Sequence, residues 1–272
     1  MKTFKDSARN DVFAFLEGKI LEIDKLLGRH EYMMIGSYVR DIHLSRAGLK
    51  SPRGTQDLDV SVAVQSLPDF SEKLEAFGPQ RGVLTRRHLG GTPIDIIPFG
   101  AIASDGSFSD GESRWELRGL AEAYKTAEFF EIGDASTSVK IPRIQAMMGL
   151  KIIAWGERLF PTDCSDFHHL LMASIDFSLD KEKGDFWDSD VWEKKDILEL
   201  YEWKTDLLAA YETGQKLADL FKGEALDRCL EVLADEDRQE EFAMSALRDK
   251  RDESYRQRYL QTQQAFLHGM QD

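Results

Sequence analysis

The segment Asp57–Val64 constrains the fold most, because apolar residues occupy every second position in it. One set of alternate positions is wholly apolar: Leu58, Val60, Val62 and Val64. The other set begins with two carboxylates, Asp57 and Asp59. Successive side chains of a strand point to opposite faces, so the pattern predicts a half-buried strand with both aspartates on its polar face. Since strands disfavour aspartate, the pair is a candidate for function.

A third aspartate, Asp95, lies in the apolar segment PIDIIPF. A carboxylate among isoleucines is costly if it is buried without a partner, so we expect a cation to compensate it. A divalent metal held by Asp57, Asp59 and Asp95 would do so. Oxygen ligands alone favour Mg²⁺ or Mn²⁺ over zinc.

Upstream, Gly36 and Ser37 stand where a predicted strand, Tyr32–Ile35, gives way to a predicted helix. Glycine permits close backbone approach, and the free N–H groups at a helix N-terminus bind anions. A phosphate site followed by three carboxylates is what metal-assisted nucleotidyl transfer needs, with two Mg²⁺ ions about 3.5–4 Å apart. Asp95 could also accept the proton of the incoming hydroxyl.

Two basic residues are candidates for contacts with the phosphates of a nucleotide. Arg40 lies one turn into the predicted helix, where it could equally pair with Asp41 or another carboxylate. Lys151 lies midway along an apolar predicted helix. Its stem could cover apolar surface while the ammonium group stays in water, but we favour phosphate binding.

The chain as a whole has the pattern of an α+β protein, with a mixed sheet flanked by helices and then an all-helical C-terminal part. After a helix over residues 7–28, the expected strands are Tyr32–Ile35, Asp57–Val64, Gly82–Arg87, Pro93–Pro98, Phe129–Ile132 and Ser138–Ile141. Gly90-Gly91 predicts a hairpin. We expect one α/β domain over residues 1–140 and a helical domain over residues 141–272.

The net charge of −14 is concentrated in residues 176–255, which hold 24 acidic and 12 basic residues. An acidic surface repels nucleic acid. We expect the charged residues of these helices to form solvated faces. The near-neutral remainder could carry a local basic patch, although its charges could equally be solvated loop residues. Candidates for that patch are Lys50, Arg53, Arg81, Arg86 and Arg87.

The composition argues against a membrane or secreted protein. No apolar run approaches the roughly 20 residues that span a bilayer, so no membrane partner is expected. The first residues, MKTFKDSARND, contain no apolar signal core. The two cysteines, Cys164 and Cys229, form no zinc-binding pattern and suit a reducing compartment. We therefore expect a cytoplasmic protein.

Three segments, IGSYVRD, TQDLDVSV and PIDIIPFG, resemble the DNA-polymerase-β-like nucleotidyltransferase superfamily, which pairs a Gly-Ser turn with Asp-x-Asp and a later strand aspartate. The long spacer between Ser37 and Asp57 is typical of the abortive-infection (AbiEii-like) toxin nucleotidyltransferases. The later stretch LKIIAWGERLFPTDCSDFHHLL is also similar to that family. The resemblance covers roughly residues 30–172, about half of the chain.

The resemblance implies a nucleotidyltransferase-type sheet and a role for each matched residue. Gly36 and Ser37 match the phosphate turn. The three strand aspartates match the two metal ligands (Asp57, Asp59) and the third acid (Asp95). Two later residues match nucleotide-binding positions, Lys151 as the triphosphate lysine and Asp166 as the late aspartate. In some relatives the acceptor is a tRNA 3′ end, and an antitoxin protein restrains the enzyme.

The sequence thus predicts a metal-dependent enzyme that moves an NMP from an NTP to a hydroxyl group, with RNA or tRNA as a possible acceptor. The resemblance further suggests the toxin of a toxin–antitoxin or phage-defence system. A small molecule or a protein side chain is an alternative acceptor. The remaining alternative is a non-catalytic nucleotide-binding module, which the presence of all three aspartates disfavours.

Overall fold

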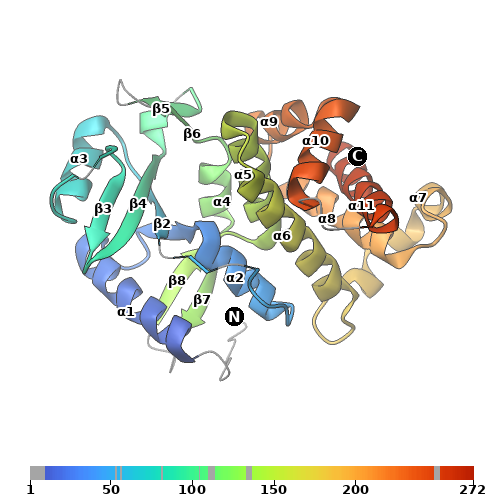
Figure 1. The fold of residues 1–272 in the computed structure, drawn as a ribbon, viewed down its shortest axis with the longest axis horizontal. Helices are drawn as coiled ribbons and strands as arrows, with labels where there is room; N and C mark the ends of the chain where they lie inside the picture. Colours follow the sequence, from blue (N-terminus) through green and yellow to red (C-terminus); the bar gives the residue numbers. More distant parts are fainter. Residues whose placement is uncertain are drawn as a thin grey trace. The chain divides into compact units, whose positions relative to one another are not determined.

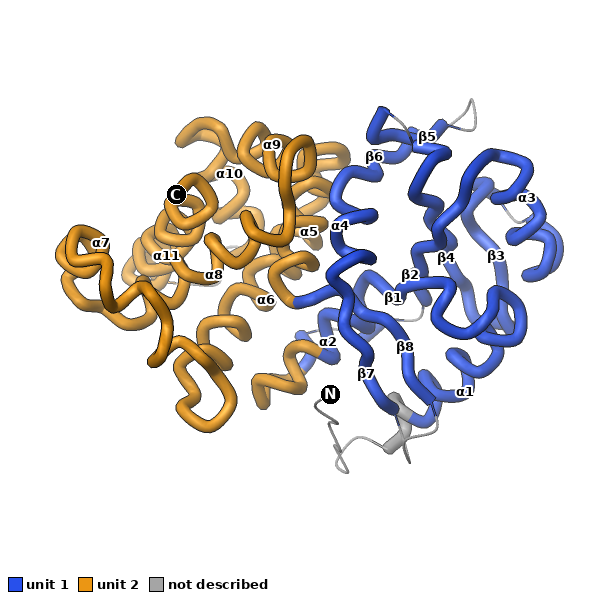
Figure 2. Tube along the Cα trace, turned by 180° about the vertical axis from the view of Figure 1, so that it is seen from behind, with its two compact units in different colours: residues 1–42, 51–143 blue, residues 43–50, 144–272 orange. Residues whose placement is uncertain are grey.

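The structure is a computed structural model of the 272-residue chain. It describes residues 10–52, 54–55, 57–80, 82–103, 105–109, 114–132, 137–247 and 252–272, with side chains from residue 14 onward. The chain divides into two compact units, coloured in Figure 2. The first unit comprises Met1–Ile42 and Ser51–Arg143, and the second comprises His43–Lys50 and Ile144–Asp272.

The first unit contains a mixed sheet (Figure 1), to which the described residues contribute six strands in the order β3-β4-β2-β1-β8-β7. The bounds are β1 Tyr32–Ile35, β2 Leu58–Ala63, β3 Arg86–Leu89, β4 Thr92–Phe99, β7 Glu128–Ile132 and β8 Thr137–Ile141. The central neighbours β2 and β4 run parallel, as do β1 and β8. The pairs β1–β2, β3–β4 and β7–β8 are antiparallel. A separate ribbon pairs β5, Ser107–Ser109, with β6, Arg114–Glu116.

The helices of the first unit are α1 Asn10–Leu27, α2 Gly36–Arg46, α3 Leu67–Glu75 and α4 Leu120–Lys125, with a 3₁₀ turn at Ala101–Ala103. From His43 onward α2 belongs to the second unit. The helix α1 forms because Leu16, Ile20 and Ile23 recur at helical spacing, which lets one face be buried as α1 packs against β8. Its predicted first residues, 7–9, lie outside the described part of the chain.

The predicted hairpin forms, but one of its strands begins later than expected. Gly90 and Gly91 both have positive φ, as the tightest hairpin turns require, and they join β3 to β4. The expected strand over Gly82–Arg87 is wrong at its start. Positive φ at Gly82 and a turn hydrogen bond from Arg86 N–H to the Val83 carbonyl keep that stretch out of the sheet.

Although the composition of residues 100–113 is typical of a loop, the strand β5 lies within this segment. The helix α4 begins at Leu120, after a turn that ends at Gly119, which has positive φ.

The second unit is helical. Its helices are α5 Ile144–Arg158, α6 Pro161–Leu179, α7 Lys195–Leu200, α8 Thr205–Leu220, α9 Glu224–Val232, α10 Glu236–Leu247 and α11 Glu253–Gln271. Two 3₁₀ turns, Phe186–Asp188 and Asp190–Glu193, precede α7. The helices α8 and α11 approach closely at two glycines. A Cβ at Gly214 would overlap the Phe266 carbonyl oxygen, and one at Gly269 would overlap that of Tyr211.

These elements confirm the predicted fold class, a mixed sheet flanked by helices and followed by a helical C-terminal part. The sheet and the helical unit each bury a core of aliphatic and aromatic side chains. In the parts of the chain that are described, every helix is too short or too polar to cross a membrane.

Candidate functional site

The three predicted strand aspartates lie on one face of the sheet in the first unit. In the parallel pair β2–β4, Asp59 is the register partner of Asp95. Partners in a ladder point to the same side, so Asp59 and Asp95 share that side. Asp57 directly precedes β2, and its carboxylate lies on the same side because Arg86 contacts both Asp57 and Asp95. Apolar residues of the same strands, among them Leu58 and Ile94, are buried on the opposite face.

Gly36 meets this group of carboxylates at the start of α2. Its φ is +73°, and a Cβ there would overlap the Asp59 Oδ2 atom and lie 2.8 Å from the Asp59 Cβ. The carboxylate of Asp59 therefore packs directly against the glycine Cα at a helix N-terminus. Ser37, the next residue, is half-buried. The structure thus brings Gly36 and Asp59 together.

Arg86, from β3, lies among these carboxylates and was not predicted as a site residue. Its Nε donates to Asp95 Oδ1 at 2.8 Å, and its Nη2 donates to Asp95 Oδ2. The same Nη2 lies 3.2 Å from Asp57 Oδ2. These hydrogen bonds, led by those with Asp95, raise the pKa of the Arg86 guanidinium above its ordinary value. The cation expected beside Asp95 is therefore supplied by the protein itself.

Tyr38, the residue after Ser37, lies close enough to the site for Asp57 to influence the pKa of its phenol. Burial is the main reason that the pKa of its phenol is raised, and the negative charges of Asp41 and Asp57 raise it further. The phenol donates a hydrogen bond to the carbonyl of Thr55, 3.4 Å away, in the loop before β2. Tyr38 thus ties that loop to α2.

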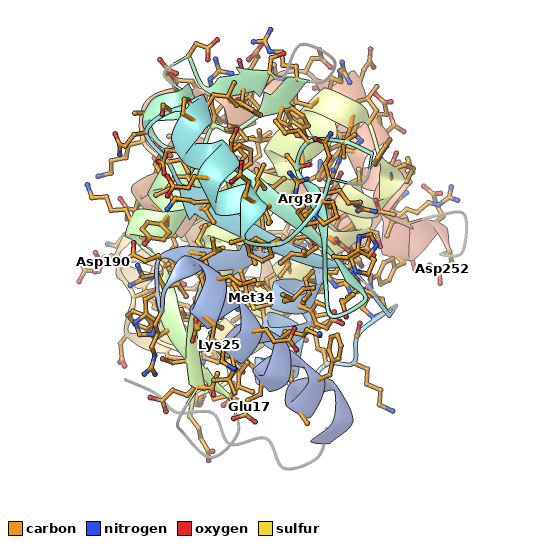
Figure 3. The ribbon with its side chains drawn as sticks, turned by 90° about the vertical axis from the view of Figure 1, so that its left-hand side faces the viewer. Glu17, Lys25, Met34, Arg87, Asp190 and Asp252 are labelled. Atoms are coloured by element: carbon orange, nitrogen blue, oxygen red, sulfur yellow. The ribbon has the colours of Figure 1, made fainter. Side chains whose placement is uncertain are left out.

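The proposed basic patch is not formed by the two arginines of β3. Arg86 binds carboxylates, and Arg87, labelled in Figure 3, is buried. Nη1 of Arg87 donates to the carbonyls of Leu84 and Arg86. Lys50 is exposed, while Arg53 and Arg81 lie outside the described residues.

Arg40 forms the ion pair that the sequence offered as its alternative role. Its side chain is 0% exposed, and its Nε donates to Asp41 Oδ1 at 2.8 Å. Ser51 completes a small network, because its hydroxyl donates to the same carboxylate oxygen at 2.9 Å. These contacts fasten the loop before β2 to α2.

Lys151 and Asp166 lie in the second unit, on α5 and α6, where they pair with each other at 2.8 Å. Lys151 also lies 3.1 Å from Asp163, whose two oxygens accept from Arg158 at 2.7 Å each. Both carboxyl side chains are 1% exposed. Because buried carboxylates are costly unless they are paired, these contacts hold α5 against α6.

The aspartates of the first unit suit a divalent cation, but the Arg86 guanidinium already binds two of them. Asp57 and Asp95 are 42% and 20% exposed, so a cation can reach them from solvent. Carboxylate oxygens suit Mg²⁺ or Mn²⁺. Among the described residues, however, no group of three or more His, Cys, Asp or Glu side chains is arranged to hold a metal. A divalent cation held by Asp57 and Asp95 would compete with the Arg86 guanidinium for their oxygens.

The chain was also compared with known proteins. No protein-family model matches it, and no curated protein sequence matches it. Among solved structures it is similar to the solution structure of the antibiotic-resistance factor ANT(2'')-Ia, with 16% sequence identity and a TM-score of 0.37. The similarity covers 71% of this chain and 98% of that one. A likeness at this level is too weak to transfer an activity, so the function must be inferred from the chain's own residues.

Proposed function

We propose that this protein is a nucleotidyltransferase that moves an NMP from an NTP to a hydroxyl group and releases pyrophosphate. The observation that carries the proposal is the convergence of Asp57, Asp59 and Asp95 on one sheet face beside Gly36. Arg86 balances part of the charge of these carboxylates, and their grouped oxygens are donors that suit a divalent cation. A helix N-terminus at the same place adds N–H groups that suit phosphate.

Each residue has a distinct role in the proposed reaction. Asp57, Asp59 and Asp95 would hold Mg²⁺ or Mn²⁺, which when bound would neutralise the charge on the phosphates. Gly36 and Ser37 would bind phosphate oxygens at the α2 N-terminus. Asp95 would accept the proton of the acceptor hydroxyl as its oxygen bonds to the α-phosphorus and the bond to pyrophosphate breaks.

The remaining predicted contacts are less direct. Lys151 is paired with Asp163 and Asp166 within the second unit, so a phosphate group would compete with those carboxylates for its ammonium group. On the resemblance alone, we propose that Lys151 and Asp166 lie at nucleotide-binding positions, and Lys151→Gln tests this through nucleotide affinity. For Arg40 the buried pair with Asp41 favours a structural role.

The test is transfer of label from each of the four labelled NTPs, with Mg²⁺ present, to RNA, protein or small hydroxylated acceptors. We expect Asp57→Asn and Asp59→Asn each to lower transfer by about 100-fold or more. Glu75→Gln, at an exposed position of α3 in the same unit, is the control and should match the parent. An active parent whose activity survives both aspartate substitutions would contradict the proposed site.

The acceptor class and the toxin role need separate tests. Label that ribonuclease removes would support an RNA acceptor, and label that resists it would support a protein or small molecule. The acidic residues 176–255 repel a polyanion, so an RNA acceptor would have to avoid the surface that they form. Inducible expression tests toxicity: arrested growth that Asp57→Asn relieves would support the toxin role. Normal growth with abundant active protein would count against it.

A further inference from the structure

Arg86 binds two of the three carboxylates of the candidate site. Its Nε and Nη2 engage both oxygens of Asp95, and Nη2 also reaches Asp57. This fork is the geometry in which a guanidinium binds a carboxylate most firmly. Arg86 thereby shields two of the three acids that the proposed function assigns to metal binding and proton transfer.

We propose that Arg86 is an internal cation that competes with the divalent metal for Asp95 and Asp57, so that metal binding requires its release. This inference rests on the proposed function. The guanidinium and a metal bound to the same oxygens would lie within a few ångströms of each other, where like charges repel strongly. Only one of the two cations can therefore hold the carboxylates at a time.

The strand that carries Arg86 permits this exchange. Arg86 and Asp95 are register partners in the antiparallel β3–β4 pair, which is held by backbone hydrogen bonds. Its side chain is 36% exposed, so the long arginine stem can rotate toward solvent without separating the strands. Once released, the guanidinium stays beside the site, where the phosphates of a bound nucleotide would accept its forked hydrogen bonds. Arg86 would thus pass from the carboxylates to the nucleotide.

The test is Mn²⁺ affinity without nucleotide, measured from the electron paramagnetic resonance signal of free Mn²⁺. We expect Arg86→Gln to bind Mn²⁺ roughly tenfold more tightly than the parent, or more, because a repelling charge is removed. Arg86→Lys keeps the charge but loses the fork, so its affinity should lie between the two. Lys73→Gln, which removes a surface pair with Asp69 in the same unit, is the matched control and should equal the parent.

A second comparison tests whether the gain in Mn²⁺ affinity arises at this site. Adding Asp95→Asn to Arg86→Gln should return Mn²⁺ affinity to the parental value or below. In EDTA, Arg86→Gln should melt at a lower temperature than the parent, because it leaves the carboxylates without a cation. Added Mn²⁺ should then raise the melting temperature of Arg86→Gln more than that of the parent. A purely structural arginine would lower the melting temperature without increasing Mn²⁺ affinity.

The outcomes separate this inference from the proposed function. Equal or weaker Mn²⁺ binding by Arg86→Gln would overturn the competition while leaving the proposed transfer activity standing. If Arg86→Gln does not fold, Arg86→Lys decides, and an affinity no greater than the parental one overturns the inference. Absence of Mn²⁺ binding in the parent and in both Arg86 variants would overturn the inference and the metal-binding part of the proposed function together.

Discussion

Replacing Gly36 by alanine tests how closely α2 approaches β2. The new Cβ would overlap Asp59 Oδ2 and lie 2.8 Å from the Asp59 Cβ. Rotation of the Asp59 side chain can remove the first overlap but not the second, because the Cβ position is set by the backbone. The start of α2 and the strand β2 must therefore separate, which disturbs the place where the carboxylates converge.

The expected loss of stability has two parts. A non-glycine residue in the left-handed region costs about 1–2 kcal/mol. Forcing an extra methyl group into a packed contact costs about 1–3 kcal/mol. Gly36→Ala should therefore lower the free energy of unfolding by about 2–5 kcal/mol, a large part of the roughly 5–15 kcal/mol that is typical of a folded protein.

The measurement is guanidinium unfolding followed by far-UV circular dichroism, with hydrogen exchange of β1 and β2 peptides as a local readout. Gly18→Ala is the matched control, since Gly18 lies in α1 with nothing within 4 Å of the new Cβ. A glycine-to-alanine change inside a helix should stabilise by about 0.4–1 kcal/mol. If Gly36→Ala is as stable as the parent, with unchanged exchange in β2, the close approach of Asp59 to Gly36 is refuted.

Three further predictions concern the second unit. Asp163→Asn should lower the free energy of unfolding by about 1–3 kcal/mol, because it removes a buried charged partner of Lys151 and Arg158, and an unchanged denaturation midpoint would contradict this. Gly269→Ala should destabilise by about 1–3 kcal/mol in the same assay by pushing α11 from α8, whereas a neutral effect would show that the helices can separate freely. Burial raises the pKa of the Cys164 and Cys229 thiols well above their usual range, which disfavours the reactive thiolate. Both should react with a thiol reagent at pH 8 only after unfolding, and fast reaction of the native protein would exclude the buried placement.

The Gly90-Gly91 turn determines which residues of β3 and β4 face each other. A two-residue turn at Gly90-Gly91 pairs Leu89 with Thr92 and, three positions further along, Arg86 with Asp95. The predicted turn therefore already placed a cation opposite the third aspartate. The turn thereby sets Arg86 beside one of the carboxylates that the sequence assigns to a metal.

By itself the sequence determined the local features: the shared face of Asp57 and Asp59, the glycine at the strand-to-helix junction, and the alternation that makes β2 half-buried. These follow from the period of two in a strand and from the backbone freedom of glycine, both of which act within a few residues.

Only the tertiary structure decided which distant groups meet. The parallel register that sets Asp59 beside Asp95 joins strands separated in the chain by α3 and β3, and the pattern of either strand alone is compatible with several registers. The ionic partners of Lys151 were likewise decided by how α5 packs on α6. Such contacts depend on how the whole core is packed, and that packing is a property of the folded chain rather than of any one segment.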